Sequence, residues 1–103
     1  MATKKVKKTP VVKSQICIVT VTGEDKVGII ARLSSEMAKV NINIVDVNQK
    51  IMESYFVMTM ACDIAGATVG LKKIKEKIAK IADDMGLKIT LQHEDIYVAM
   101  HRV

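Results

Sequence analysis

The stretch Ile16–Gln49, ICIVTVTGEDKVGIIARLSSEMAKVNINIVDVNQ, decides how this chain folds. It begins with a β-branched apolar run that is typical of a buried strand. A polar turn around Gly23 ends that run, and it is followed by a helix-like pattern and a second run rich in Ile and Val. The first turn of a helix leaves backbone N–H groups unpaired. The junction at residues 22–28 is therefore predicted to present hydrogen-bond donors to an anion or polar ligand.

The helix within this stretch has one apolar face with 3-4-3 spacing, which we expect to be buried: Ile30, Leu33, Met37 and Val40. Asp25 precedes it and has the side chain of a helix cap, which would accept bonds from backbone N–H groups two or three residues on. Asn41 is a suitable last residue, because Asn tolerates left-handed backbone angles.

The rest of the chain predicts a hairpin, a helix and a strand. The expected strand 42–52 has mixed faces, with Ile42 and Ile44 on the side of Asp46, which indicates a strand at a sheet edge. Glu53–Ser54 would turn the chain into the strand 55–63, whose expected inward side comprises Phe56, Met58, Met60 and Cys62. A longer helix follows, with one apolar face formed by Leu71, Ile74, Ile78, Ile81 and Met85. Gly86 would end it, and residues 87–92 alternate like a half-buried strand.

The expected order βαββαβ predicts an α+β fold. We expect a ferredoxin-like sandwich, in which a four-stranded antiparallel sheet has two helices on one face. Residues 1–14 form a basic flexible arm in this prediction, residues 15–93 the folded domain, and residues 94–103 a tail or short helix packed on the domain or on a dimer partner. The fold alone does not decide function.

The charge distribution argues against nucleic acid as the main partner. The net charge is +5, and five lysines lie within the first fifteen residues. With these five removed from the 16 Lys and Arg, the remaining 11 equal the 11 Asp and Glu. A basic arm is a weaker nucleic-acid signal than a basic face. No apolar run reaches the roughly 18 residues of a membrane span and no signal-peptide pattern is present, so we expect a cytoplasmic protein.

Other chemistry-bearing residues do not form a recognisable catalytic or metal site. Cys17 and Cys62 lie in apolar runs and are interpreted as core residues; a disulfide would require their strands to be neighbours. His93, Glu94, Asp95 and His101 do not have the spacing of a compact metal site. No base accompanies Ser34 or Ser35 for nucleophilic catalysis. We therefore predict no enzyme activity, no cofactor and no metal.

The combination of these motifs resembles the ACT domain, a regulatory module that binds amino acids and related ligands. The resemblance rests on Asp25-Lys26-Val27-Gly28 at the first junction, on Asn43-Ile44 in the second strand and on the βαββαβ order. Together with Tyr55-Phe56-Val57-Met58 and the closing segment 93–102, the chain looks like the stand-alone ACT proteins of the UPF0237 group. The resemblance covers about residues 15–103.

The resemblance implies a ligand site shared between two copies of the domain, with the glycine junction from one copy and the second strand from the other. The implied ligand-binding residues are Asp25, Lys26, Val27, Gly28, Asn43, Ile44 and Asp46. Gly28 would allow close approach, and Asn43 can both donate and accept hydrogen bonds. The alternative is that Asp25 only caps the helix and Gly28 only permits close packing. A protein-interaction adaptor without a small ligand is the second hypothesis, and a nucleic-acid-associated regulator acting through the arm is the third.

Overall fold

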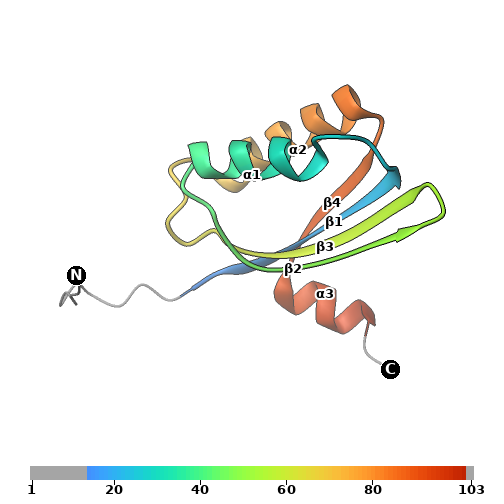
Figure 1. Cartoon of the computed structure of the whole chain (residues 1–103). Helices are drawn as coiled ribbons and strands as arrows, with labels where there is room; N and C mark the ends of the chain where they lie inside the picture. The colour runs from blue at the N-terminus through green and yellow to red at the C-terminus, as the bar shows by residue number, and fades with distance from the viewer. Residues whose placement is uncertain (1–13, 102–103) are drawn as a thin grey trace, which may run out of the picture.

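The computed structural model describes residues 14–101, which form a four-stranded sheet with helices on both of its faces (Figure 1). The elements are β1 (Ile16–Glu24), α1 (Ile29–Lys39), β2 (Asn43–Met52), β3 (Tyr55–Asp63), α2 (Leu71–Met85), β4 (Lys88–His93) and α3 (Glu94–His101). The strands lie in the order β2-β3-β1-β4, and each neighbouring pair is antiparallel. The helices α1 and α2 cover one face, and α3 lies against the other. The predicted ferredoxin-like α+β sandwich is confirmed.

The core lies between the sheet and the two helices α1 and α2. On β3, Phe56, Met58, Met60 and Cys62 are each at most 2% exposed, as the alternation of the strand predicts. Their partners across the β1–β3 pair include Val19 and Val21, which are fully buried. Phe56 is the one aromatic side chain in a core that is otherwise aliphatic and sulfur-containing.

The strand β2 lies at the edge of the sheet and contains a β-bulge. Ile44 pairs with Cys62, but the next paired residue is Asp46, opposite Ala61, so Val45 is the extra residue. The bulge moves Asp46 to the face opposite that of Ile44. The expectation that Ile42 and Ile44 share a face with Asp46 is therefore wrong, because strict alternation does not pass through a bulge.

The helix α1 begins at Ile29, later than a cap at Asp25 predicts, and it buries a different isoleucine from the one expected. Its buried residues are Ile29, Leu33 and Met37, whereas Ile30 is 43% exposed. Ile30 was expected on the buried face, and this is wrong. Both isoleucines are within one helical turn of Leu33, so the spacing cannot distinguish them. The expected helix end is confirmed, since Asn41 follows the C-cap Val40 and has a left-handed φ of 60°.

The helix α2 packs beside α1 and ends where the sequence predicts. Gly86 is its C-cap, with a left-handed φ of 64°. Ile74, Ile78 and Ile81 are buried and Met85 is partly buried, but Leu71 is 44% exposed because it is the first residue of the helix. Leu71 was expected to be buried, and this is wrong.

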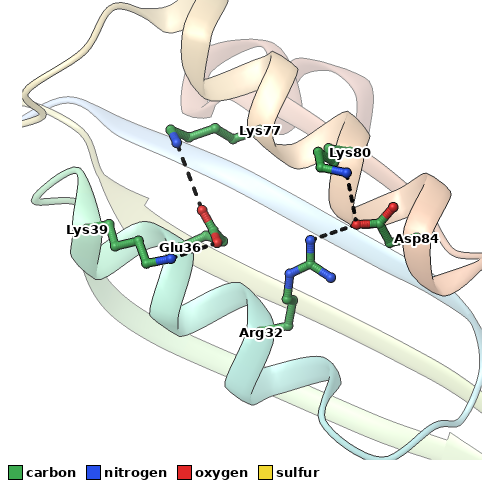
Figure 2. Close-up of polar contacts among 6 residues, drawn as sticks. All are labelled: Arg32, Glu36, Lys39, Lys77, Lys80 and Asp84. Atoms are coloured by element: carbon green, nitrogen blue, oxygen red, sulfur yellow. Dashed lines mark hydrogen bonds and ion pairs between the residues drawn. The ribbon is translucent and has the colours of Figure 1, made fainter.

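Two acidic side chains connect α1 and α2 (Figure 2). Arg32 donates to the carboxylate of Asp84 over 2.8 Å, and Lys80 lies 3.4 Å from the same oxygen. Glu36 lies 3.2 Å from Lys39 of its own helix and 3.9 Å from Lys77 of α2. Because these pairs are at the surface, they contribute more to the alignment of the two helices than to stability.

The helix α3 lies on the face of the sheet opposite α1 and α2, where it contacts β1 and β4 (Figure 1). On β1, Ile18, which alternates with the core residue Val19, is only 9% exposed. The arm expected at residues 1–14 lies outside the described residues except for Ser14, and so does the end of the expected tail at residues 102–103. Within residues 14–101, no helix is both long and apolar enough to cross a membrane.

Candidate functional site: the junction between the first strand and first helix

The loop between β1 and α1 holds Asp25 without using its side chain as a cap. The backbone N–H of Asp25 donates to the carbonyl of Ser54 over 2.8 Å, which ties the loop to the β2–β3 hairpin. The N-cap position of α1 is occupied by Gly28, and no side chain caps this end. The capping role expected for Asp25 is therefore wrong: the helix begins at Ile29, and Asp25 lies three residues before its N-cap.

Gly28 has a backbone conformation that favours glycine, and it faces open space. Its φ is +90°, where an L side chain is strained, and a Cβ built on it would have no neighbour within 4 Å. The first turn of α1 contains no acidic residue to offset the positive end of the helix dipole. The junction therefore combines steric access with exposed backbone donors, which favours a negatively charged group.

The two side chains between Asp25 and Gly28 both point into solvent. Val27 is 99% exposed, so it contacts almost nothing in its own chain. Lys26 lies 4.0 Å from Glu24, at the limit of an ion pair. Both side chains are therefore accessible to another molecule at the junction.

The residues expected from the second strand lie in three different environments. Asn43 is exposed and pairs with Asp63 in the sheet. Ile44 is partly buried and packs against the core, so its side chain is a structural element in this chain. Asp46 is exposed and accepts a hydrogen bond from the backbone N–H of Val47 over 2.9 Å, which fixes its carboxylate near the bulge.

Within one chain, the two parts of the predicted site do not meet. Asn43 pairs with Asp63, and Asp63 pairs with Ile16 at the start of β1, whereas Gly28 follows the other end of β1. The β2–β3 hairpin, rather than Asn43, lies beside the loop. Asn43 instead lines a shallow polar hollow with Asn41, Asp63 and Gly66.

The free edge of β2, the strand that the resemblance implies in a contact with a second copy, carries exposed apolar side chains. Val45, Val47, Ile51 and Met52 are between 44% and 60% exposed, and Tyr55 after the turn is 49% exposed. The sequence contains a trace of this apolar edge, because the apolar residues of the strand switch from even positions (42 and 44) to odd positions (45, 47 and 51). An edge strand with unpaired backbone groups and apolar side chains can pair with another strand.

Two other polar residues considered in the sequence, His93 and Ser34, make local hydrogen bonds. In the described part of the chain, no group of three or more His, Cys, Asp and Glu residues could hold a metal. His93 accepts from the backbone N–H of Asp95 over 3.1 Å, which is a capping contact. Ser34 bonds the carbonyl of Ala31 within its own helix.

Cys17 and Cys62 face each other across β1 and β3, and both are free thiols. Their strands are neighbours, as a disulfide would require. Burial raises the pKa of the Cys62 thiol to about 11, and the nearby Cys17 adds to the rise. Burial also raises the pKa of Cys17, and the charge of Lys75 partly offsets that rise. The interpretation as core residues therefore fits, since a raised pKa lowers thiol reactivity.

Comparison with known proteins places this fold in a class of small regulatory domains that bind small ligands. An ACT domain family model matches residues 15–92, and so the chain belongs to the ACT domain family. It is 45% identical to a UPF0237 protein of Listeria monocytogenes, over 84% of this chain and 97% of that protein. It is 40% identical to a UPF0237 protein of Methanocaldococcus jannaschii, over 84% and 96%. An ACT domain protein from Streptococcus pneumoniae superposes with a TM-score of 0.70 at 26% identity, covering 82% of this chain and 96% of that one.

Proposed function

We propose that this chain is a non-enzymatic regulatory module that binds an amino acid or similar small molecule at the interface of a homodimer. The observation that carries the proposal is the open junction at Gly28, where an uncapped helix end is accessible in a glycine-specific conformation. A ligand carboxylate is the group that this end favours, because backbone N–H groups and the helix dipole act together there.

A second copy can complete the site through the free edge of β2. In a twofold antiparallel pairing of two β2 strands, the start of each strand lies next to the end of the other. Asn43 of a second copy would then lie near Met52 and the hairpin whose Ser54 carbonyl holds Asp25. This arrangement explains why Asn43 and Gly28 lie apart in a single chain. It also gives a reason for the exposure of the apolar side chains Val45, Val47, Ile51 and Met52 on this strand.

The polar residues of the proposed site complement the two ends of an amino acid. The carboxylate would lie at the Gly28 helix end. Asn43 of the other copy supplies both a donor and an acceptor, and the carboxylates of Asp25 and Asp46 can meet an ammonium group. Val27 would close over the ligand or the second copy, because its side chain has no contact of its own.

Thermal-shift and calorimetric screening against the amino acids at millimolar concentration tests this function. Binding should raise the melting temperature of the wild type, since a ligand that binds only the native state stabilises it. Gly28→Leu should abolish the shift. Gly86→Leu is a matched control, because it places the same side chain at another left-handed glycine with open space. No stabilisation of the wild type by any amino acid would contradict the proposal.

The exposed edge of β2 also favours a protein-interaction adaptor without a small ligand as a second candidate. The two functions are separable by pull-down with the wild type and the Gly28→Leu variant. An adaptor would recover the same partner with both proteins and would show no amino-acid shift. The expected cytoplasmic location remains a prediction, and so does the less favoured nucleic-acid role of the arm, which lies outside the described residues.

A further inference from the structure

A separate hollow lies at the end of the sheet away from Gly28. It is enclosed by the first turns of α2, by the start of β1 and by the end of β4, and it has a volume of about 510 Å³. This volume is within the roughly 300–1,000 Å³ of pockets that hold small molecules. None of the residues proposed for the Gly28 site lines it.

The wall of this cavity is apolar and partly exposed. Leu71, Ile74, Leu91 and Ile96 line it, and Cys17 forms part of it. Leu71 is 44% exposed and Ile96 is 54% exposed, although both are large aliphatic side chains. An apolar ligand that covers them would remove this surface from water, at about 25 cal/mol per Å².

The charged group at the cavity is a lysine without an ion-pair partner among the described residues. Lys75 lines the cavity, whereas its neighbours Lys73 and Lys77 pair with Glu76 and Glu36. Lys75 and Cys17 line the same cavity, and the charge of Lys75 partly offsets the rise in the pKa of Cys17. No lining residue is acidic, so the charge of Lys75 is not balanced there.

The adjoining end of α2 adds to this positive field. Gly70 is the N-cap, no side chain caps the helix, and its first turn contains no acid. A Cβ at Gly70 would have no neighbour within 4 Å, so the approach to this end is open. The helix dipole and Lys75 therefore favour the same sign of ligand charge.

We propose that this cavity is a second binding site, which takes a small amphipathic carboxylate. The hydrocarbon chain lies against Leu71, Leu91 and Ile96, and the carboxylate pairs with the ammonium of Lys75. An apolar wall with one unbalanced cation matches a ligand with one apolar end and one anionic end. The site is independent of the Gly28 junction, and neither proposal requires the other.

Titration of isotope-labelled full-length protein with octanoate, followed by NMR of backbone amides and methyl groups, tests this proposal. Octanoate should shift the methyl signals of Leu71, Leu91 and Ile96 at millimolar concentration. Octylamine, which has the same chain and the opposite charge, should bind at least about fivefold more weakly. Equal binding of the two would overturn the assignment of Lys75 as the anion partner.

Two variants with a control make the test specific. Lys75→Met should weaken octanoate binding by about fivefold. Lys72→Met should leave it unchanged, because Lys72 is exposed in the same turn but does not line the cavity. Ile96→Glu should abolish binding through charge repulsion, without a cost in folding, since Ile96 is already half exposed.

The proposal fails if Lys75→Met and Lys72→Met bind octanoate equally well, or if octanoate shifts no methyl signal of the cavity. It also fails if the chemical shifts of these methyl groups change with protein concentration rather than with octanoate, since a second copy of the chain would then occupy the cavity.

Discussion

Gly28 and Asn43 lie at opposite ends of the same sheet, because Asn43 is joined through Asp63 to the start of β1 and Gly28 follows its end. A ligand that touches both residues must therefore contact two copies of the chain. In the proposed twofold pairing of β2 edges, Asn43 of one copy approaches the Gly28 junction of the other, so ligand binding would require dimerisation.

Charged substitution on the β2 edge should dissociate the dimer. Val47→Lys and Ile51→Lys place a like charge on both sides of a twofold contact, and we expect each to weaken the dimer by at least about tenfold. Light scattering coupled to size-exclusion chromatography measures the change in mass. Val98→Lys on α3 is the control, because Val98 is 51% exposed but distant from the edge. A dimer that survives both edge variants would contradict this interface.

Gly23→Ala should destabilise the domain by about 1–3 kcal/mol, as expected for overpacking. An added Cβ would lie 2.7 Å from the Cδ2 of Leu87, a buried side chain at the turn after α2. Chemical denaturation measures the loss. Gly70→Ala, where the added methyl group meets nothing within 4 Å, should have a free energy of unfolding close to that of the wild type. Equal effects of the two substitutions would show that Leu87 is not tightly packed on β1.

Local sequence patterns predict some helix ends and turns of this domain correctly, but not the start of α1 or the bulge in β2. Asn41 and Gly86 are correctly predicted, because left-handed backbone positions select few residue types. The Glu53–Ser54 turn is also correctly predicted, although Glu53 adopts a left-handed φ of 59° that its residue type does not favour. The start of α1 was placed too early, since a glycine N-cap gives no side-chain signal and Asp25 offers a false one. The bulge at Val45 could not be assigned from alternation alone, because a strand with two mixed faces fits either register.

The sequence likewise predicts one part of the candidate site and not the other. The motif Asp25–Gly28 marks the correct junction, because glycine is required by its φ of +90°. The relation of Gly28 to Asn43 depends on strand order across the sheet, which no local pattern encodes. The position of Lys75 beside an apolar cavity follows only from the packing of α2 on β1 and β4, which the helix pattern does not encode.

The buried thiol of Cys62 should make the domain less stable at alkaline pH. Its pKa in the folded protein is about 11, above its usual 9.0. The unfolded state therefore loses this proton first, and roughly 2–3 kcal/mol of stability should disappear as the pH rises from 9 to 11. Denaturation at several pH values should show a flatter decline for Cys62→Ala than for the wild type. Identical slopes would contradict a raised pKa.

The carboxylates between α1 and α2 should make stability fall in acid. The hydrogen bond from Arg32 lowers the pKa of Asp84, and the one from Lys39 lowers the pKa of Glu36. This stabilisation is complete above the ordinary carboxylate range, about pH 4, and is lost as the pH falls through the lowered values. Arg32→Gln should reduce the difference in denaturation midpoint between pH 6 and pH 3. Lys73→Gln, which removes a longer pair with Glu76, is the control.

In the proposed dimer, one ligand site contains Gly28 from one copy and Asn43 from the other. Mixing two variants that each lack one of these residues tests this shared site directly. Gly28→Leu and Asn43→Leu should each abolish binding of the amino acid that stabilises the wild type most. After the two are unfolded together and refolded at equal concentrations, calorimetry should recover roughly a quarter of the wild-type sites, because half of the dimers are mixed and each of these has one intact site. A mixture that binds no ligand, although mixed dimers form, would contradict the shared site, and so would an Asn43→Leu variant that binds normally.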